Sequence, residues 1–373
     1  PNAEPEGYVK AELIQRGQLG SLVPQRDLEY SSHTAGGVTV YPVSKEIRYP
    51  DESNLSTTIE TAYAYTYHSG TTQVDQQTIT LPVIGTGQNG SGTANTRQDV
   101  FDDFGNRTWS RNERGVIQHF VYDRATGALI QQIDDVDTSV VSGAPAGWTT
   151  PSGGGLNLVT DLEADDQGRT VQVLGPTHTI SLNGTATVIR RATWTVYDEP
   201  AHTTRIGQGY ATGSSPSYTF TLINPVQIQQ RDHSERPLEE IQATRASTAG
   251  KLVPADTFAQ TDYTRWATSQ YTDCCLLESQ RIYHTIPASG AGAPTTNYDQ
   301  TTFGYDSMKR RNRVVTPGGT ITFSVIDVRD LTISVFVGTN EDGATESDPT
   351  GGGLDPDNNM VLVTTNEYDD GLP

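Results

Sequence analysis

The sequence predicts an all-β protein: a repetitive antiparallel β-sheet of hairpins that forms an open ribbon or a partial β-shell. Segments such as TATVIRRATWTVYD (185–198), GTITFSVID (319–327) and LTISVFVG (331–338) alternate apolar and polar side chains and are rich in β-branched residues. Gly, Pro, Asn and Asp fall between such segments at turn spacing. Pairs of an aromatic residue and an acid also recur at a regular interval, which is typical of a repeat architecture.

The aromatic–acid pairs give the length of the repeat. Asp102 and Asp123 are 21 residues apart, and Asp306 and Asp327 are again 21 apart. Such a period fits two strands of about seven residues and two turns, which is one hairpin per repeat. We expect the acid to end a strand and accept backbone N–H groups in the turn. A Gly two or three residues later then supplies the positive φ that the turn needs.

A longer repeat connects the two halves of the chain. FDDFGNRTWSRNERGVIQHFVYD (101–123) aligns without gaps to YDSMKRRNRVVTPGGTITFSVID (305–327), at an offset of 204 residues. A Gly triplet follows in both halves, in PSGGGL (151–156) and PTGGGL (349–354). We therefore predict a first repeat unit at 1–168 with an N-terminal insertion, and a second at 169–373 that is truncated at its C-terminal end. One continuous sheet would accommodate both units.

The motif residues suggest a family. The best copies contain Asp102 with Gly105 and Arg107, Tyr122 and Asp123 with Gly127, Tyr197 and Asp198, Tyr305 and Asp306, and Tyr368 and Asp369. This pattern resembles the YD repeat of RHS proteins over residues 100–373, and residues 1–95 more loosely resemble long secreted bacterial members. The resemblance implies a β-sheet ribbon that, in relatives, spirals into a hollow shell around a toxin or cargo, or serves in adhesion. It also implies an extracellular or cell-surface location.

Within this ribbon the motif side chains have expected roles. Tyr122, Tyr197 and Tyr305 should be largely buried between strands, with their hydroxyls bonded or reaching water. Arg107 and Arg311 should pair with carboxylates of adjacent turns. The segment ERPLEEIQATRAS (235–247) is the best helix candidate, although a strand fits it equally well.

Composition excludes several classes of function. The formal net charge of −20 argues against binding to nucleic acid or an anionic membrane. No apolar run approaches the ~20 residues that span a bilayer. Hydrophobic residues make up 34% of the chain, which suits a sheet with one wet face. We therefore expect no nucleic-acid partner and no membrane insertion.

Sequence motifs that indicate catalysis or metal binding are weak in this chain. RDHSERP (231–237) places an acid, His and Ser side by side, but catalytic triads assemble in space and not along the sequence. Neither G-x-S-x-G nor H-E-x-x-H is present. The adjacent Cys274 and Cys275 suit two small residues on opposite faces of a strand, and a vicinal disulfide, a link to another chain or free thiols are the other options. Asp134, Asp135 and Asp137 are weak candidates for calcium. We expect no enzyme activity and no other cofactor.

The favoured function is structural: an extracellular repeat protein that forms a fibre, surface layer or wall by head-to-tail sheet assembly. The first alternative is a wall segment of a toxin-encapsulating RHS shell. The second is a carbohydrate-binding adhesin that uses exposed tryptophans, which would be Trp109, Trp148, Trp194 or Trp266. The expected partner is another copy or a longer continuation of the chain, with residues 1–18 completing the sheet at residues 367–373.

Overall fold

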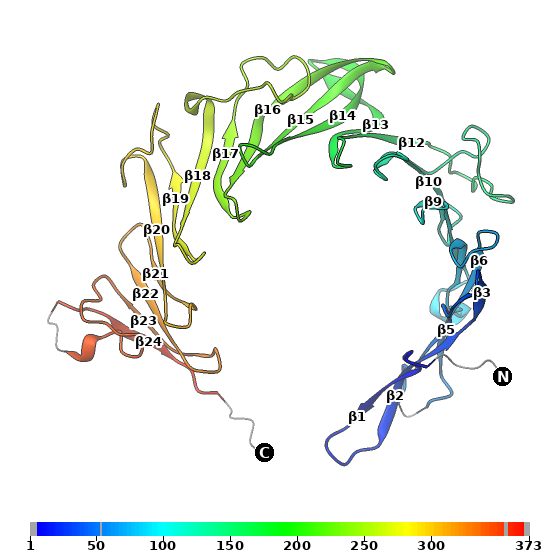
Figure 1. Cartoon of the computed structure of the whole chain (residues 1–373), viewed down its shortest axis with the longest axis horizontal. Helices are drawn as coiled ribbons and strands as arrows, with labels where there is room; N and C mark the ends of the chain where they lie inside the picture. The colour runs from blue at the N-terminus through cyan, green and yellow to red at the C-terminus, as the bar shows by residue number, and fades with distance from the viewer. Residues whose placement is uncertain (1–5, 53, 354–356, 369–373) are drawn as a thin grey trace. The chain divides into compact units, whose positions relative to one another are not determined.

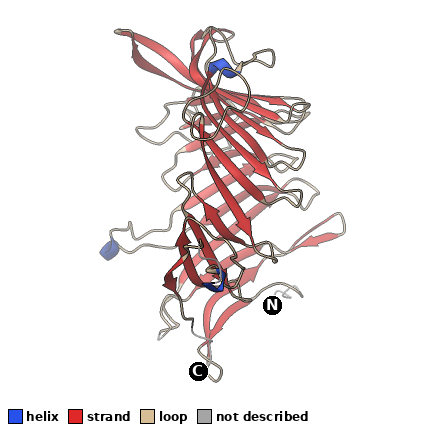
Figure 2. Ribbon diagram, turned by 90° about the vertical axis from the view of Figure 1, so that its left-hand side faces the viewer, coloured by secondary structure: helices blue, strands red, loops and turns tan. Residues whose placement is uncertain are grey.

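The computed structural model describes residues 6–52, 54–353 and 357–368, and the chain divides into two compact units, Pro1–Arg190 and Arg191–Pro373. The described residues contain no α-helix (Figure 2), only the short 3-10 segments Thr86–Gln88, Gln260–Asp262 and Gly351–Gly353. None of them forms a helix that is long and apolar enough to cross a bilayer. The predicted all-β antiparallel fold is confirmed.

Strands of the first unit pair with antiparallel neighbours, largely in chain order (Figure 1). A separate small sheet consists of β3 (His33–Ala35) and β4 (Val38–Val40), so that β2 pairs directly with β5. The other strands are β1 (Ala11–Gln15), β2 (Leu22–Tyr30), β5 (Val43–Arg48), β6 (Ile59–Tyr67), β7 (Val74–Thr80), β8 (Thr96–Phe101), β9 (Arg107–Arg111), β10 (Ile117–Tyr122), β11 (Leu129–Asp134), β12 (Leu158–Ala164) and β13 (Thr170–Leu182).

The boundary between the two compact units lies inside β14 (Thr185–Asp198). The second unit continues with β15 (Thr203–Ser214), β16 (Ser217–Arg231), β17 (Pro237–Ala243), β18 (Tyr263–Tyr271), β19 (Leu277–Tyr283), β20 (Tyr298–Tyr305), β21 (Arg311–Val315), β22 (Ile321–Ile326), β23 (Thr332–Gly338) and β24 (Val361–Thr365). The helix candidate at 235–247 is therefore a strand, β17, because its residues pair with strands on both sides.

Connections differ between the two ends of the strands. In an antiparallel succession every second connection lies at the same end of the sheet. In the second unit the tight connections 232–236, 272–276, 306–310 and 327–331 alternate with 244–262, 284–297, 316–320 and 339–360. The acid turns 232–236, 306–310 and 327–331 thus share one end, while the long loops 244–262, 284–297 and 339–360 leave from the other. One repeat is one hairpin, and its length is about 21 residues where the opposite connection is short, as with 316–320 between Asp306 and Asp327.

The 204-residue offset is visible in the strand pairing. In the first unit Ile117 is opposite Arg111, and in the second Ile321 is opposite Val315, each shifted by 204. The next turn differs by one residue, since Tyr122 faces Leu129 whereas Ile326 faces Thr332. The chain divides into compact units between Arg190 and Arg191, whereas the expected repeat boundary lies between residues 168 and 169. The boundaries of the repeat units stay a prediction.

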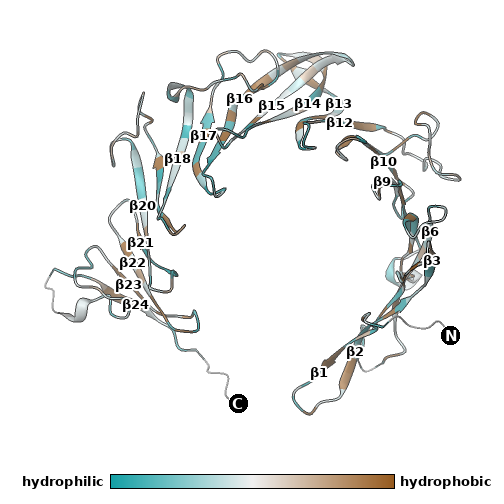
Figure 3. Cartoon of the chain, in the orientation of Figure 1, coloured by the Kyte–Doolittle hydropathy of each residue, from teal (hydrophilic) through white to brown (hydrophobic). Residues whose placement is uncertain are grey.

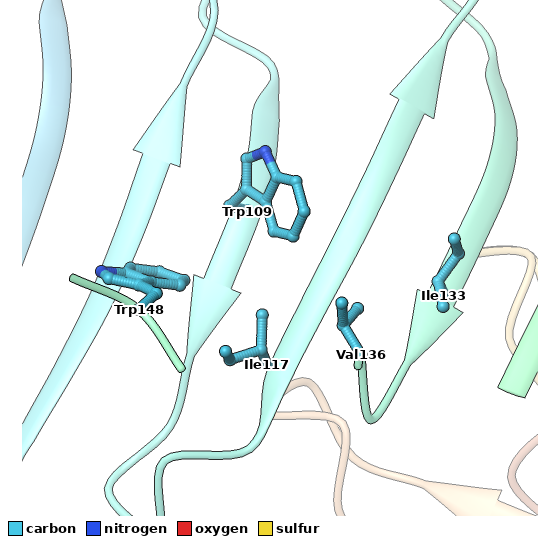
Figure 4. Packing of buried hydrophobic residues seen from close by; sticks show 5 residues of the cluster. All are labelled: Trp109, Ile117, Ile133, Val136 and Trp148. Atoms are coloured by element: carbon cyan, nitrogen blue, oxygen red, sulfur yellow. The ribbon is translucent and has the colours of Figure 1, made fainter. Parts of the chain in front are cut away.

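A loop closes the core of the first unit. Trp109, Ile117 and Ile133 project from neighbouring strands, and Val136 and Trp148 come from the long connection 135–157 (Figure 4). All five side chains are buried together. This face of the sheet is therefore covered by its own connection, and no second sheet is needed to exclude water from it.

The core of the second unit includes a row across five strands. Ile228, Ile241, Trp266, Tyr283 and Tyr298 are buried on β16, β17, β18, β19 and β20. The rings of Trp266 and Tyr283 stack with their centroids 3.9 Å apart. The hydroxyl of Tyr283 donates to the carbonyl of Ala291 at 2.9 Å, which attaches the connection 284–297 to this face.

Trp194 shows how closely the backbone approaches the core. A Cβ added to Gly209 would lie 2.8 Å from the Trp194 ring and 2.1 Å from the carbonyl oxygen of Thr221. Only glycine fits at this position. All four tryptophans of the chain are buried, which are Trp109, Trp148, Trp194 and Trp266.

Candidate functional site

The acid turns are built as hydrogen-bonded loops. Oδ1 of Asp102 accepts the backbone N–H groups of Phe104 at 3.0 Å and Asn106 at 2.8 Å. Oδ1 of Asp306 accepts those of Met308 at 3.0 Å and Arg310 at 2.8 Å. Asp102 and Asp306 thus occupy equivalent turns, 204 residues apart.

The same turn occurs at other spacings. Asp165, Asp232, Asp327 and also Asn112 accept N–H groups from the residues two and four positions later. The residue three positions after the acid or Asn has a positive φ, and it is Gly105, Gly115, Gly168, Glu235, Lys309 or Asp330. The turn therefore identifies a hairpin repeat, but by itself it does not distinguish a duplication of 204 residues from a simple 21-residue repeat.

The arginine partner of these turns is the residue four positions after the acid, whereas the sequence analysis assigned this pairing to Arg107 and Arg311. Arg169, Arg236 and Arg310 follow their aspartates by four residues, and each Nε donates to the second carboxylate oxygen at 2.6–2.8 Å. The signal was a D-x-x-x-R spacing. Desolvation raises the pKa of Asp306, but the hydrogen bonds and charge of Arg310 outweigh it, so the pKa lies below its ordinary value.

The expected partners of Arg107 and Arg311 were wrong. Arg107 approaches Asp99, a carboxylate within β8, at 3.4 Å, and its guanidinium lies 4.8 Å from the centre of the Phe120 ring. Arg311 lies over the Phe303 ring at 5.4 Å. Both arginines are in strands and reach across the sheet face. The neighbouring turn carboxylates already have partners, because Asp102 accepts the side-chain amide of Asn106 at 3.1 Å and Asp306 accepts Nε of Arg310 at 2.7 Å.

The motif tyrosines are half-buried, so burial between strands is less complete than expected. The hydroxyl of Tyr122 donates to the carbonyl of Arg107 at 3.3 Å, and that of Tyr305 to Leu277 at 2.9 Å. Burial raises the pKa of Tyr122. Tyr197 is half-buried as well. The bridged partners lie on neighbouring strands, so Tyr122 and Tyr305 tie the sheet together across its pairs.

The remaining motif residues also serve turns and edges. Asp123 accepts the N–H and the hydroxyl of Thr126 at 2.9 and 2.7 Å, and Gly127 follows with φ 71°. Asp198 accepts the N–H of Ala201 at 3.3 Å. Tyr368 donates to the carbonyl of Thr332 at 2.9 Å. Asp369 lies outside the described residues.

The calcium candidates do not converge on one point. Asp135 accepts the N–H groups of Gly155 and Leu156, and Asp137 accepts Ser139. Asp134 accepts side-chain amides of β10 and β11. Among the described residues no three His, Cys, Asp or Glu side chains form a group that could hold a metal ion. The geometry therefore gives calcium no support here, because the carboxylates shape the loop instead.

Two other segments that the sequence analysis singled out lie in turns. Cys274 and Cys275 are free and exposed in the connection 272–276, so the expected placement on opposite faces of a strand was wrong. In RDHSERP, Asp232 is the acceptor of an acid turn and is bonded to Arg236. His233 lies beside His202 of the neighbouring turn, with ring centroids 4.5 Å apart.

A polar hollow of about 390 Å³ opens on the first unit, and we call it the β7–β11 hollow. Its polar groups complement one another. Asp99 pairs with Arg107 at 3.4 Å, and the Gln118 amide donates to Asp134 at 2.6 Å. The lining residues are Ile79, Arg97, Asp99, Arg107, Ser110, Asn112, Val116, Gln118, Asp134 and Asp135.

A second hollow, of about 310 Å³, opens on the second unit, and we call it the β16–β19 hollow. Cross-strand pairing explains its floor: Gln227, Gln242 and Arg265 form one row, and Gln229, Glu240, Ala267 and Ile282 form the next. Gln280, Ile228 and Ile241 complete the lining. Figure 3 shows hydrophilic segments on β17, at this part of the sheet.

Most polar groups of the β16–β19 hollow lack intramolecular partners, and the exception is Gln229, whose side-chain oxygen accepts from Arg231 at 3.5 Å. Within the described part of the chain, the side chains of Gln227, Glu240, Gln242, Arg265 and Gln280 make no hydrogen bond or ion pair. The neighbouring Glu239 points to the opposite, covered face, as alternation along β17 requires. Burial raises the pKa of Glu239. The open face thus presents one carboxylate, one guanidinium and several amides to solvent.

Comparisons with known proteins add little to this geometry. No family model matches the chain, and no curated protein is similar to it. Similar solved structures include the crystal structure of TcdB2-TccC3, at 13% identity and a TM-score of 0.24 over 96% of this chain and 21% of that one. TcdB2-TccC3-TEV is also similar, at 13% and 0.21 over 88% of this chain and 20% of that one.

A mutant of the Photorhabdus luminescens Tc holotoxin pore matches at 10% identity and a TM-score of 0.17, over 87% of this chain and 22% of that one. The chain thus spans about a fifth of the length of these Tc toxin chains. Likenesses at TM-scores this low carry no argument about what this chain does.

Proposed function

We propose that this protein is an extracellular structural repeat protein whose sheet grows by strand addition between copies. The observation that carries the proposal is the state of the two outer strands. Among the described residues β24 pairs only with β23, and β1 only with β2. Unpaired N–H and C=O groups on such edges favour pairing with another strand.

The side chains of the edge strands support the same conclusion. On β24, Val361, Leu362 and Val363 are 62%, 50% and 57% exposed, and on β1 Leu13 and Ile14 are 48% and 56% exposed. In Figure 3, β1 is correspondingly coloured as hydrophobic. Edge strands of monomeric proteins usually carry charge or Pro instead. Pairing of β24 of one copy with β1 of the next is a heterologous contact, which generates filaments when it does not close.

The two alternatives differ in their support. A wall segment of a toxin-encapsulating shell would use the same edges, but its contacts would close into a particle. The carbohydrate-binding adhesin loses the surface on which it was based, because Trp109, Trp148, Trp194 and Trp266 are all buried and offer no ring face to a sugar.

Light scattering across a dilution series, with negative-stain images, tests the proposal. The double variant Val361→Lys, Val363→Lys should stay monomeric at concentrations where the parent protein forms filaments, because charges on an edge strand oppose pairing. Ile223→Lys is the matched control, since Ile223 is 53% exposed on β16, which is paired on both sides. A parent protein that is monomeric at every concentration overturns the proposal, and closed hollow particles favour the shell.

A further inference from the structure

We propose that the β16–β19 hollow is a binding site for a neutral oligosaccharide. This site is separate from the edge strands and does not depend on assembly. It rests on the five polar side chains without intramolecular partners that surround one hollow of about 310 Å³.

The unpaired state is notable because partners are within reach. Glu240 and Arg265 are diagonal neighbours across β17 and β18, since Glu240 faces Ala267 and Arg265 lies two residues before it. Diagonal neighbours are about 7–8 Å apart, which long side chains bridge easily. No ion pair joins them, although many other arginines of this chain are paired with acids. Both groups therefore remain available to a ligand.

The dimensions suit several sugar rings. The hollow crosses four adjacent strands, β16 to β19. Strands are spaced by about 4.8 Å, so three intervals give a floor of roughly 14 Å. The two cross-strand rows lie about 7 Å apart along the strands, since each residue advances by about 3.3 Å. The floor is formed by strands that are paired with one another in the absence of any ligand.

The chemistry of the lining favours hydroxyl groups. A side-chain amide offers two donors and an acceptor, and a hydroxyl group can both donate and accept. Gln227, Gln242 and Gln280 thus match a polyol without regard to its orientation. Ala267 and Ile282 add apolar surface for the C–H faces of a sugar.

Charge decides between neutral and ionic ligands. Glu240 and Arg265 contribute opposite charges, so the site as a whole prefers neither sign. An anionic polymer would also be repelled by the formal net charge of −20. A neutral oligosaccharide satisfies the carboxylate with its hydroxyl donors and the guanidinium with its oxygen acceptors.

Binding of the full chain to immobilised hexasaccharides of glucose (α- and β-linked) and of N-acetylglucosamine tests this proposal, with dextran sulfate as an anionic control. At least one neutral hexasaccharide should bind. Glu240→Ala, Arg265→Ala and Gln242→Ala should each weaken binding by about tenfold. Gln167→Ala is the control, because Gln167 is an exposed glutamine in the turn 165–169 of the first unit.

Melting curves of each variant separate loss of binding from loss of folding. The exposed side chains of Glu240 and Arg265, which have no partners, can be removed with little change in melting temperature, and the same measurement checks the half-buried Gln242. Weakened binding in the three hollow variants, with an unchanged Gln167→Ala variant, supports the site. Binding that is equal in all variants, binding to dextran sulfate alone, or failure of all the hexasaccharides to bind would overturn it.

Discussion

The β7–β11 and β16–β19 hollows have the same construction and opposite chemistry. Both lie on the open face of neighbouring strands, and both are lined by amides, carboxylates and arginine. In the first, Asp99 is paired with Arg107 and Asp134 with Gln118. In the second, Glu240 and Arg265 have no partner among the described residues.

This difference teaches that polarity alone does not make a site. A polar strand face whose groups bond to one another is a poor binding site, because a ligand would have to break internal hydrogen bonds to bind. A face whose polar side chains bond only to water loses only these water contacts when a ligand binds. The following predictions separate these two states.

The largest effects should come from the covered faces behind both hollows. Trp109 precedes Ser110 of the first hollow, and Trp266 lies between Arg265 and Ala267 of the second. Trp109→Ala and Trp266→Ala should each lower the free energy of unfolding by about 3–5 kcal/mol, because both rings are buried. Urea denaturation measures this, with Val140→Ala as a control at a 71% exposed position. Losses below about 1 kcal/mol would contradict the assigned cores.

The acidic side chains of the two hollows should differ in how much they contribute to the stability of the protein. Asp134→Ala leaves the amides of Gln118 and Gln132 without their acceptor and should destabilise the protein by about 2 kcal/mol. Glu240→Ala should change stability by less than about 0.5 kcal/mol. Chemical denaturation of both variants tests the comparison directly. Equal losses of stability in the two variants would mean that Glu240 has an internal partner and that the β16–β19 hollow is not a binding site.

The turns that end the strands should add a smaller, pH-dependent effect. Asp306→Asn keeps the acceptor, as Asn112 does in its own turn, but loses the charge facing Arg310. After allowance for solvent screening, the expected loss near neutral pH is about 1 kcal/mol. The pKa of Asp306 is lowered by folding, so its contribution is present above the unfolded pKa of about 4 and lost as pH falls through the folded value.

Melting temperatures of the parent protein and of Asp306→Asn should therefore converge in acid. Asp103→Asn is a suitable control, because Asp103 is the exposed neighbour of the equivalent turn acid Asp102. A gap that stays constant from neutral pH to acid would show that the charge of Asp306 does not stabilise the turn.

The smallest effect concerns the carboxyl group of Glu239 on the covered face of β17. Burial raises the pKa of Glu239, so its favourable contribution exists below the unfolded pKa and disappears as pH rises through the folded value. Glu239→Gln should thus raise the melting temperature slightly in mild alkali and leave it unchanged in acid. Gln242→Ala, which removes no ionisable group from the open face of β17, is the control. An effect of Glu239→Gln that does not change with pH would contradict the burial of Glu239.

Several features were predictable from residue patterns alone. The acid turns at Asp102 and Asp306 follow from local hydrogen bonding and from the need for a positive φ three residues later. An arginine also follows the acid by four residues in the sequence, at Arg169, Arg236 and Arg310, but the pairing was assigned to Arg107 and Arg311 instead. Such features depend on a few consecutive residues, so sequence suffices for them.

The placement of the tryptophans could not be predicted in this way. Alternation puts Trp109 and Ser110 on opposite faces, but it does not say which face is covered. The connection 135–157 decides this by placing Val136 and Trp148 over Trp109. The partner of Arg107 depends likewise on register, which brings Phe101 opposite Arg107 and leaves Asp99 within reach.

The sequence by itself determined the all-β class, the hairpin period of about 21 residues and the chemistry of the acid turns, because each follows from local backbone preference and alternation. The tertiary structure alone decided which side chains face one another across strands and which face each connection covers. Those contacts join residues far apart in the chain, such as Gln227 with Gln242 and Arg265, and only the pairing register brings them together. The paired and the unpaired hollow therefore look alike in sequence and differ only once the strands are aligned.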